Sequence, residues 1–421
     1  MTERFFDAVV VGAGAAGLSV AAEIARHGHS VALLDRENTS GGILNQCIHN
    51  GFGVHHYKEE LTGPEFAARL IALIENLDGI ELCLGTTVLD TREEGEEKFL
   101  YAVSRDRGVT KFVCRAVVLA MGCRERNRGN TGIPGTRPSG ILTAGFAQRL
   151  VNLEGYIPGR DVVIVGSGDI GLIMARRMTW VGARVHGVIE RKPYPSGLAR
   201  NVAQCLTDFR IPLYLSHIIS EIHGRDRIEA VSITPLDGDQ PNPDRTFRIV
   251  CDTLLLSVGL VPDNDLSRKL GVRINPETHG PFVDGRLMTS RPGIFACGNV
   301  LHVHDLVDFA TEEAIRCGEF ASEYLERPDK GVSPQYFVRS GANVKYVVPN
   351  SYVSDRDNIF YLRPMIAKER GELLVTLDGE QIMKKRLPRL QPSEMISFRL
   401  GPANLRDVNA DRHNLIEVNV G

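Results

Sequence analysis

The feature that most constrains the fold is a pattern of strand, glycine turn, helix and strand that occurs twice. The first copy contains the turn GAGAAG at residues 12–17, after an apolar, β-branched run and before an alanine-rich stretch. The second contains GSGDIG at 166–171 with similar flanks. Each copy continues into an apolar run that closes on an acid, Asp35 or Glu190. The repetition predicts an α/β fold with two Rossmann-like dinucleotide-binding domains.

The spacing of the glycines explains why such a turn binds a dinucleotide. The first glycine permits the tight turn, the second lets a pyrophosphate approach the backbone, and the third lets helix and strand pack closely. The phosphates then lie at the helix N-terminus, where free N–H groups and the helix dipole favour anions. The predicted ligands in the two turns are Gly12, Gly14, Gly17, Gly166, Gly168 and Gly171.

The acid that closes each copy is predicted to bind ribose hydroxyls. Asp35 and Glu190 lie 18 and 19 residues after the last glycine of their turns, close to the spacing of about 20 that this fold prefers. Glu190 would repel the 2′-phosphate of NADP, which favours NAD at the second turn, although Arg191 beside it weakens that preference. The other predicted ligands near the turns are Arg36, Asp169 and Arg191.

Composition argues against several other classes of protein. The chain has 49 Lys and Arg against 52 Asp and Glu, a net charge of −3, and no long run of either sign. Neither a nucleic-acid partner nor a polybasic membrane patch is therefore expected. No stretch of 18 uninterrupted apolar residues predicts a transmembrane helix. The eight cysteines are scattered without a C-x-x-C motif, which disfavours an iron–sulfur cluster or redox pair and, without an export signal, predicts the cytoplasm.

The pattern of apolar and polar residues changes near the C-terminus. From Arg339 onward, short alternating runs are separated by turn residues, with no stretch of helical period. This pattern predicts a small antiparallel β domain, similar to a sandwich. The segment Arg327–Gln335, which contains proline and glycine, is the predicted linker.

A further motif resembles a known family. Residues 288–300, MTSRPGIFACGNV, resemble the second FAD motif of the two-dinucleotide flavoprotein reductases. In that family the strand ends in Gly-Asp, and the acid binds the ribityl and pyrophosphate part of FAD; here Asn299 keeps a hydrogen-bonding side chain without the charge. VVLAMG at 117–122 and LSVGLVPDN at 256–264 resemble the two crossover strands of the family. This order of motifs over residues 7–330 implies FAD at the first turn and NAD at the second.

The resemblance also implies further ligands and a domain order. The helix that begins near Asp308 is expected to direct its N-terminus at the N1/O2 edge of the flavin, where reduced flavin carries negative charge. The additional implied cofactor ligands are Gly42, Gly122, Gly259, Gly298, Asn299 and Ala310. The implied domains are an FAD domain at 1–135 and 262–330, an inserted NAD domain at 136–261 and the β domain at 336–421.

A finer resemblance bears on function. The positions of the redox cysteine pair in disulfide reductases of this family are empty here. Residues 41–53, residues 138–148 and the β-rich tail resemble a bacterial subfamily that includes the FAD subunits of opine oxidases, hydrogen cyanide synthase and the sarcosine oxidase α chain. Similar proteins accompany a glycerol-3-phosphate-dehydrogenase-like flavoprotein and a small cysteine-rich protein. The resemblance implies an FAD-dependent subunit that transfers electrons between NAD(H) and a second flavoprotein or a small iron–sulfur or cysteine-rich protein, in a glycerol-3-phosphate, opine or amino-acid dehydrogenase.

Two alternatives stay open. A lone cysteine near flavin, here Cys47, can form a sulfenic acid, which would give a stand-alone NADH oxidase or peroxidase, although a buried thiol is the commoner role of cysteine. A structural flavin-binding subunit with a vestigial NAD site is the second alternative. The histidines near the motifs are interpreted as polar loop residues around a cofactor, and no metal site is predicted. They are His49, His55, His56, His302 and His304.

Overall fold

The computed structural model describes residues 1–328, 336–405 and 414–421. Residues 329–335, which make up most of the predicted linker, lie outside these ranges. No helix in the described ranges is long and apolar enough to cross a membrane.

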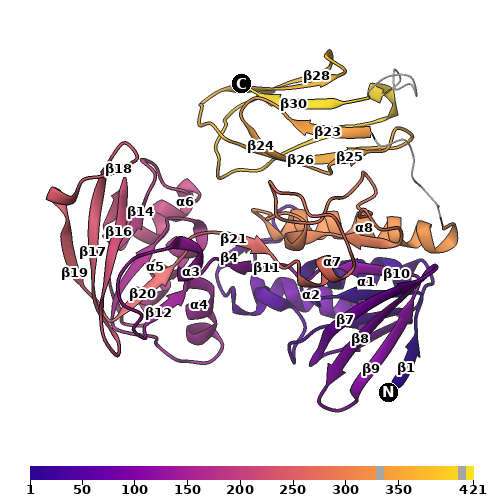
Figure 1. Ribbon diagram of the computed structural model, residues 1–421, viewed down its shortest axis with the longest axis horizontal. Helices are drawn as coiled ribbons and strands as arrows, with labels where there is room; N and C mark the ends of the chain where they lie inside the picture. Colours follow the sequence, from indigo (N-terminus) through magenta and orange to yellow (C-terminus); the bar gives the residue numbers. More distant parts are fainter. Residues whose placement is uncertain (329–335, 406–413) are drawn as a thin grey trace. The chain divides into compact units, whose positions relative to one another are not determined.

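Two compact units make up the described chain (Figure 1). One is formed by Met1–Cys123 together with Pro262–Gly421, and the other is Arg124–Val261. Each unit contains a five-stranded parallel sheet, and the first also carries the C-terminal β domain. The predicted fold class is therefore confirmed, whereas the exact domain boundaries given above stay a prediction.

The parallel sheet of the first unit has the strand order β22-β10-β2-β3-β6. Its strands are β2 (Ala8–Val11), β3 (Val31–Leu34), β6 (Ile80–Cys83), β10 (Ala116–Leu119) and β22 (Ile294–Ala296). Every residue of β2, β3 and β10 is buried, which explains why these strands are continuous apolar runs without alternation. The strand order reverses at β2, between β3 and β10, and α/β sheets bind ligands at such a switch point.

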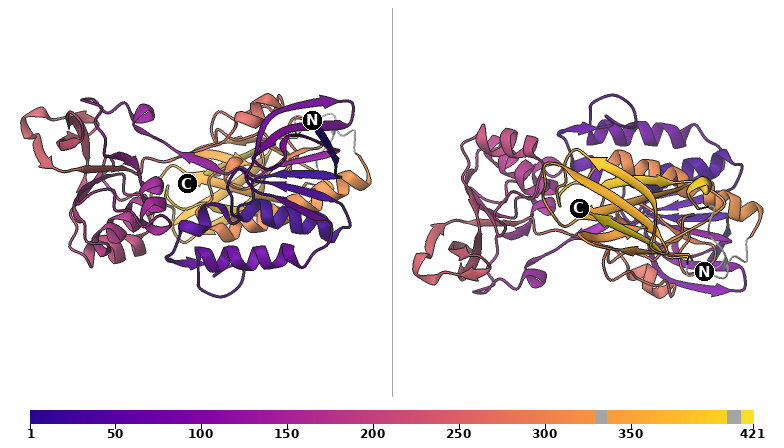
Figure 2. Two further views of the ribbon diagram at one scale, coloured as in Figure 1. Left: turned by 90° about the horizontal axis from the view of Figure 1, so that it is seen from below. Right: turned by 90° about the horizontal axis from the view of Figure 1, so that it is seen from above.

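Three long helices pack in this unit, and α1 contacts both of the others (Figures 1 and 2). They are α1 (Ala15–Arg26), α2 (Gly63–Glu75) and α8 (Val307–Glu326). The start of α2 is fixed by a capping box, in which the side chains of Thr62 and Glu65 each accept the backbone N–H of the other residue.

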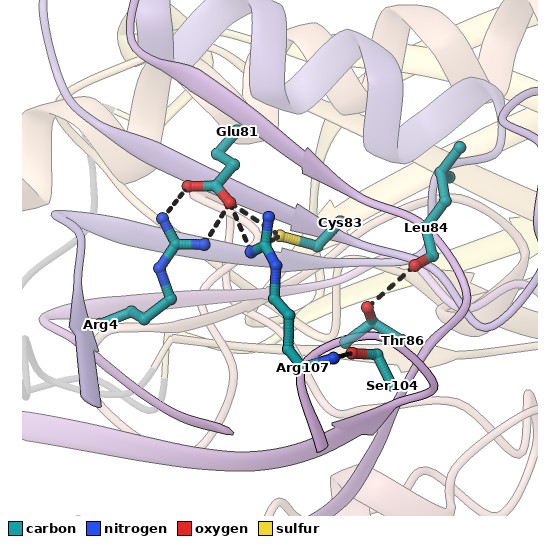
Figure 3. Close-up of polar contacts among 7 residues, drawn as sticks. All are labelled: Arg4, Glu81, Cys83, Leu84, Thr86, Ser104 and Arg107. Atoms are coloured by element: carbon teal, nitrogen blue, oxygen red, sulfur yellow. Dashed lines mark hydrogen bonds and ion pairs between the residues drawn. The ribbon is translucent and has the colours of Figure 1, made fainter. Parts of the chain in front are cut away.

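A second sheet, of order β1-β9-β8-β7, extends the first unit. Its strands are β1 (Thr2–Phe5), β7 (Thr86–Glu94), β8 (Glu97–Ser104) and β9 (Gly108–Cys114). Glu81 of β6 joins the two sheets, because its carboxylate pairs with the guanidinium of Arg4 in β1 and, at 2.7 Å, with that of Arg107 (Figure 3). Burial alone would raise the pKa of Glu81, but the hydrogen bonds from both arginines lower it to about 2.

The parallel sheet of the second unit has the order β12-β20-β13-β14-β15. Its strands are β12 (Ile141–Thr143), β13 (Asp161–Val165), β14 (Arg184–Glu190), β15 (Leu213–Leu215) and β20 (Thr253–Leu256), and its main helices are α4 (Ala144–Asn152) and α5 (Asp169–Trp180). Here the order reverses at β13, as it does at β2 in the first unit. An antiparallel sheet is added by β16 (His217–Gly224), β17 (Ile228–Asp237), β18 (Gln240–Pro241) and β19 (Phe247–Val250).

The C-terminal β domain consists of two sheets, of order β25-β23-β30-β27-β28 and β24-β26-β29, around a shared apolar core. Its strands are β23 (Tyr336–Ser340), β24 (Val344–Val348), β25 (Ser351–Tyr352), β26 (Asn358–Pro364), β27 (Gly371–Leu377), β28 (Glu380–Leu387), β29 (Ile396–Leu400) and β30 (Ile416–Val420). The pairing departs from the predicted antiparallel pattern in one place, since β23 and β30 run parallel. These strands are far apart in the sequence, so no hairpin forces them to be antiparallel.

The remaining elements are short. They are β4 (Asn50–Phe52), β5 (Leu61–Thr62), β11 (Cys123–Glu125), β21 (Leu260–Pro262), α3 (Arg128–Thr131), α6 (Ala199–Val202), α7 (Asp265–Lys269) and five single-turn segments, among them η1 (Gly42–Gln46) and η4 (Gly298–Val300).

Candidate functional site

The first glycine turn joins β2 to α1, and each of its glycines has a separate steric reason. Gly12 has φ +105°, and a Cβ atom there would lie 2.4 Å from the carbonyl oxygen of Ala120. A Cβ on Gly17 would lie 1.6 Å from the carbonyl oxygen of Gly12. Gly14 differs, because no atom lies within 4 Å of the position of its missing Cβ. The turn is therefore tightly packed at both ends and open at its middle glycine.

The N-terminus of α1 is suited to an anion. Its N-cap is Gly14, no side chain caps it, and its first turn contains no acidic residue. The first N–H groups of a helix have no partner within the helix, and the dipole places positive charge at the same end. The open space at Gly14 and this helix end together fit the pyrophosphate of a dinucleotide.

Other predicted FAD ligands converge on the same turn. A Cβ on Gly42 would lie 3.0 Å from the Cα of Gly14, and one on Gly298 would lie 2.8 Å from the Cβ of Ala16. Gly122, with φ +71°, has open space at its Cβ position and directly follows Met121, whose Cα would lie 3.2 Å from a Cβ on Gly12. The structure thus brings together glycines from four separate parts of the first unit.

Asp308, which the sequence indicated only as the start of a helix, binds a loop that lies far away in the sequence. Asp308 is buried in the first turn of α8. Its Oδ1 accepts the N–H groups of His55 (2.9 Å) and His56 (2.8 Å), and its Oδ2 accepts that of Gly53 (3.2 Å). The predicted ligand Ala310 lies in the same turn of the helix and is buried. No local sequence signal could have revealed the loop contact, because its partners lie about 250 residues earlier.

The second glycine turn repeats the geometry of the first. A Cβ on Gly166 would lie 2.0 Å from the carbonyl oxygen of Ser257, and one on Gly171 would lie 2.4 Å from that of Gly166. The middle glycine, Gly168, is again open, with the nearest atom 3.9 Å from its Cβ position. Gly168 is the N-cap of α5, which also has no side-chain cap but, unlike α1, carries an acid, Asp169, in its first turn. Gly259, with φ +100°, lies beyond β20 in the same unit.

The two strand-end acids make the same contacts in both units. Asp35 Oδ2 accepts the N–H of Ala13 at 2.6 Å, and Glu190 Oε2 accepts the N–H of Ser167 at 3.0 Å. The other oxygen of each carboxylate accepts the N–H of the second residue after it, at 2.8 and 3.0 Å. Each acid therefore holds its glycine turn in place, a role that the sequence analysis missed. The predicted contact with ribose stays a prediction.

Three further predicted ligands have different surroundings. Asp169 Oδ1 accepts the N–H of Leu198 at 2.9 Å and the side-chain amide of Asn201 at 2.6 Å. This carboxylate therefore fastens the following segment beside the second turn. Arg36 and Arg191 are exposed directly after the two strand-end acids.

Cys47 does not have the properties of a reactive thiol. It follows η1 and is partly buried, and burial raises the pKa of its thiol to about 12. Because the thiolate is the nucleophile, this environment disfavours sulfenic-acid chemistry at neutral pH. All eight cysteines lie in the described residues, and none of them forms a disulfide.

The five histidines singled out in the sequence separate into two groups. His302 and His304 converge with Glu313 of α8, and the three side chains place ligand atoms within 4.8 Å of one another. The other three lie in the 49–56 loop, where their rings contact aromatic side chains. The sequence did not indicate that Glu313 would join the cluster, and the absence of a metal site stays a prediction.

The chain is similar in sequence to known proteins. The profile described as pyridine nucleotide-disulphide oxidoreductase matches residues 6–314. The HcnB chain of hydrogen cyanide synthase from Pseudomonas protegens is 25% identical over 335 residues, which cover 74% of this chain and 67% of HcnB. An opine oxidase subunit of Agrobacterium tumefaciens is 25% identical over 314 residues, which cover 70% of this chain and 61% of that relative.

A solved structure shares the fold. The thioredoxin reductase of T. acidophilum superposes with a TM-score of 0.63 at 23% identity, over 76% of this chain and 98% of that one.

Proposed function

Because this chain belongs to the pyridine nucleotide-disulphide oxidoreductase family, we propose that it passes electrons between NAD(H) and a partner redox subunit of a multi-component dehydrogenase. The chain is an FAD- and NAD(P)-dependent oxidoreductase. The observation that carries the proposal is the pair of glycine turns, each open at its middle glycine, in a chain whose described residues contain no disulfide. FAD and NAD, held by the glycine turns of the two units, would supply hydride-transfer chemistry.

The first unit would hold FAD. Its turn offers the open Gly14 position and the uncapped end of α1 to the pyrophosphate. Asn299 Oδ1 accepts the N–H of His304 at 3.0 Å, so the amide nitrogen of the same side chain can donate to an acceptor such as a ribityl or phosphate oxygen. The other proposed FAD ligands are Gly12, Gly17, Asp35, Arg36, Gly42, Gly122, Gly298 and Ala310.

The second unit would hold NAD rather than NADP. The Glu190 carboxylate is almost fully buried and is fixed by the N–H of Ser167, so it cannot easily move aside. A 2′-phosphate beside this fixed negative charge would be repelled. The other proposed ligands in this unit are Gly166, Gly168, Asp169, Gly171, Arg191 and Gly259.

The relatives of this chain suggest which proteins would accept or donate its electrons. HcnB and the opine oxidase relative are both named as subunits, and this chain covers about two thirds of their length or less. Burial of Cys47 disfavours the stand-alone peroxidase. We therefore propose a second flavoprotein and a small iron–sulfur or cysteine-rich protein as partners, for oxidation of glycerol-3-phosphate, an opine or an amino acid. Eight cysteines without a disulfide agree with the cytoplasm as the proposed location.

The experiment is anaerobic reduction of the purified, FAD-loaded chain by NADH, followed by the visible absorbance of the flavin. We expect bleaching within seconds with NADH and much slower bleaching with NADPH. Proteins that co-purify from the native host, with their flavin and iron content measured, are then added back. Turnover of an organic substrate should need them.

Two results would count against the proposal. Full-rate turnover of an organic substrate by the chain alone would remove the need for a partner. A flavin that NADH does not reduce would favour the structural subunit with a vestigial NAD site.

A further inference from the structure

Three buried side chains form a hydrogen-bonded cluster beside the second FAD motif. His302 and His304 follow η4, and Glu313 faces them from the second turn of α8. His302 Nε2 lies 3.0 Å from Glu313 Oε2, and His304 Nε2 lies 3.2 Å from Glu313 Oε1. The exposed fractions of the three side chains are 0%, 1% and 0%. The carboxylate is therefore held from both oxygens in a site without solvent.

The cluster is bonded directly to the motif. Glu313 Oε1 also accepts the N–H of Gly298 at 2.7 Å, and the N–H of His304 donates to Asn299 Oδ1. Gly298 in turn packs on Ala16 in the first turn of α1. Glu313 thus fixes the backbone of the second FAD motif against the helix that carries the first.

The electrostatics agree with this geometry. Burial alone would raise the pKa of Glu313, but His304 and His302 hold it well below its usual range. Burial lowers the pKa of His302 to about 4. The hydrogen bonds that the carboxylate accepts lie in surroundings of low polarity, which strengthens them.

The C-terminal β domain covers the cluster. The ring of Tyr361 in β26 lies 5.3 Å from that of His302 and 5.5 Å from that of His304. The Tyr361 hydroxyl accepts a hydrogen bond from Arg316 of α8 at 2.9 Å. Arg363 of β26 binds the loop between the histidines and α8, with an ion pair to Asp305 at 2.6 Å. These contacts exclude water from the carboxylate.

Two histidines and a carboxylate are also a candidate metal centre. However, both Nε2 atoms already face the carboxylate at hydrogen-bond distance. The described residues provide three ligands at this position, whereas buried structural zinc sites almost always have four. The observations therefore favour a hydrogen-bonded anion over a bound metal.

On the basis of the proposed function, we infer that Glu313 is a positioning residue for FAD. It holds the Gly298–Asn299 turn in the conformation that binds the cofactor. The two histidines keep the carboxylate oriented.

The test compares Glu313→Gln with Glu319→Gln, which makes the same chemical change at an exposed position of the same helix. The measurements are the dissociation constant of FAD for the apoprotein, the flavin midpoint potential and the metal content of each purified holoprotein. We expect Glu313→Gln to weaken FAD binding about tenfold and to shift the midpoint potential, because the turn that it holds would move relative to the cofactor. Glu319→Gln should change neither, and the unaltered protein should contain no stoichiometric metal.

Two results would overturn the inference. They are a Glu313→Gln protein that matches Glu319→Gln in both FAD affinity and potential, and one divalent metal per chain that disappears in Glu313→Gln. If Glu313→Gln does not fold, His302→Gln, which keeps a donor, and His302→Leu, which removes it, replace it. Equal FAD affinity in these two would then overturn the inference. The proposed electron transfer fails separately, if NADH does not reduce the FAD that the unaltered protein holds.

Discussion

The contrast between Gly14 and Gly17 gives a strong test of the cofactor site. The two glycines are three residues apart in one turn, yet they differ completely in the space around a missing Cβ. Alanine at position 17 would place its Cβ 1.6 Å from the carbonyl oxygen of Gly12, where real Cβ atoms stay beyond 3.0 Å. Alanine at position 14 would meet no protein atom within 4 Å, and its φ of −80° suits alanine.

The expected magnitudes follow from this difference. In Gly17→Ala the helix must move away from a backbone oxygen, which we expect to cost the apoprotein about 3 kcal/mol or more. In Gly14→Ala the loss of glycine at the N-cap and the gain from a stiffer unfolded chain roughly cancel, so the apoprotein should stay within about 1 kcal/mol. The new methyl would occupy the proposed place of the pyrophosphate, and FAD should bind about 100-fold more weakly, or about 2.7 kcal/mol.

Two assays separate these effects. Urea unfolding of each apoprotein gives its stability, and quenching of FAD fluorescence on titration gives the dissociation constant. Gly168→Ala serves as the matched control, because the same change at the second turn should slow reduction by NADH while FAD affinity stays unchanged. A Gly14→Ala protein that binds FAD normally would refute the assignment of the first turn. A Gly17→Ala apoprotein of normal stability would refute the steric argument.

Three further predictions concern other side chains. Cys47→Ser should leave NADH-dependent peroxide turnover unchanged, because the thiol is protonated at neutral pH; a tenfold loss would restore the peroxidase alternative. Asp308→Asn should loosen residues 53–56 and destabilise the protein by about 1–3 kcal/mol, visible as faster amide hydrogen exchange there and contradicted by unchanged exchange. The lowered pKa of Glu81, about 2 against 4.5, predicts that Glu81→Gln costs about 1–3 kcal/mol of unfolding free energy above pH 4.5. That difference should disappear as the pH falls towards 2, and a cost independent of pH would contradict the ion-pair explanation.

The sequence predicted the parts of the fold that depend on local pattern. The buried runs of β2 and β13, the glycine turns after them and the acids at Asp35 and Glu190 all follow from residue type and spacing. Contacts between distant segments were not predictable in this way. The parallel pairing of β23 with β30 is one example, since nothing in either strand specifies its direction.

In the candidate site, too, contacts between distant segments could not be predicted from the sequence. Gly14 and Gly42 were both predicted as ligands, but their approach to each other depends on how η1 folds back over the turn. Glu313 is one of two adjacent glutamates, and only the register of α8 decides that it, rather than Glu312, is buried against the histidines. The contacts of Asp35 and Glu190 with their turns were missed because a ribose and a backbone N–H both need an acceptor at that place.

The proposed double use of Glu190, towards the glycine turn and towards the nucleotide, has a consequence for redesign of nucleotide preference. A change from NAD to NADP would ordinarily begin by replacing this acid with a small or basic residue. Here the replacement would also remove the acceptor for the N–H of Ser167 and so loosen the turn that we propose binds the phosphates. A useful variant must keep a neutral acceptor at position 190 and introduce the positive charge elsewhere, for which the exposed Arg191 already provides a starting point.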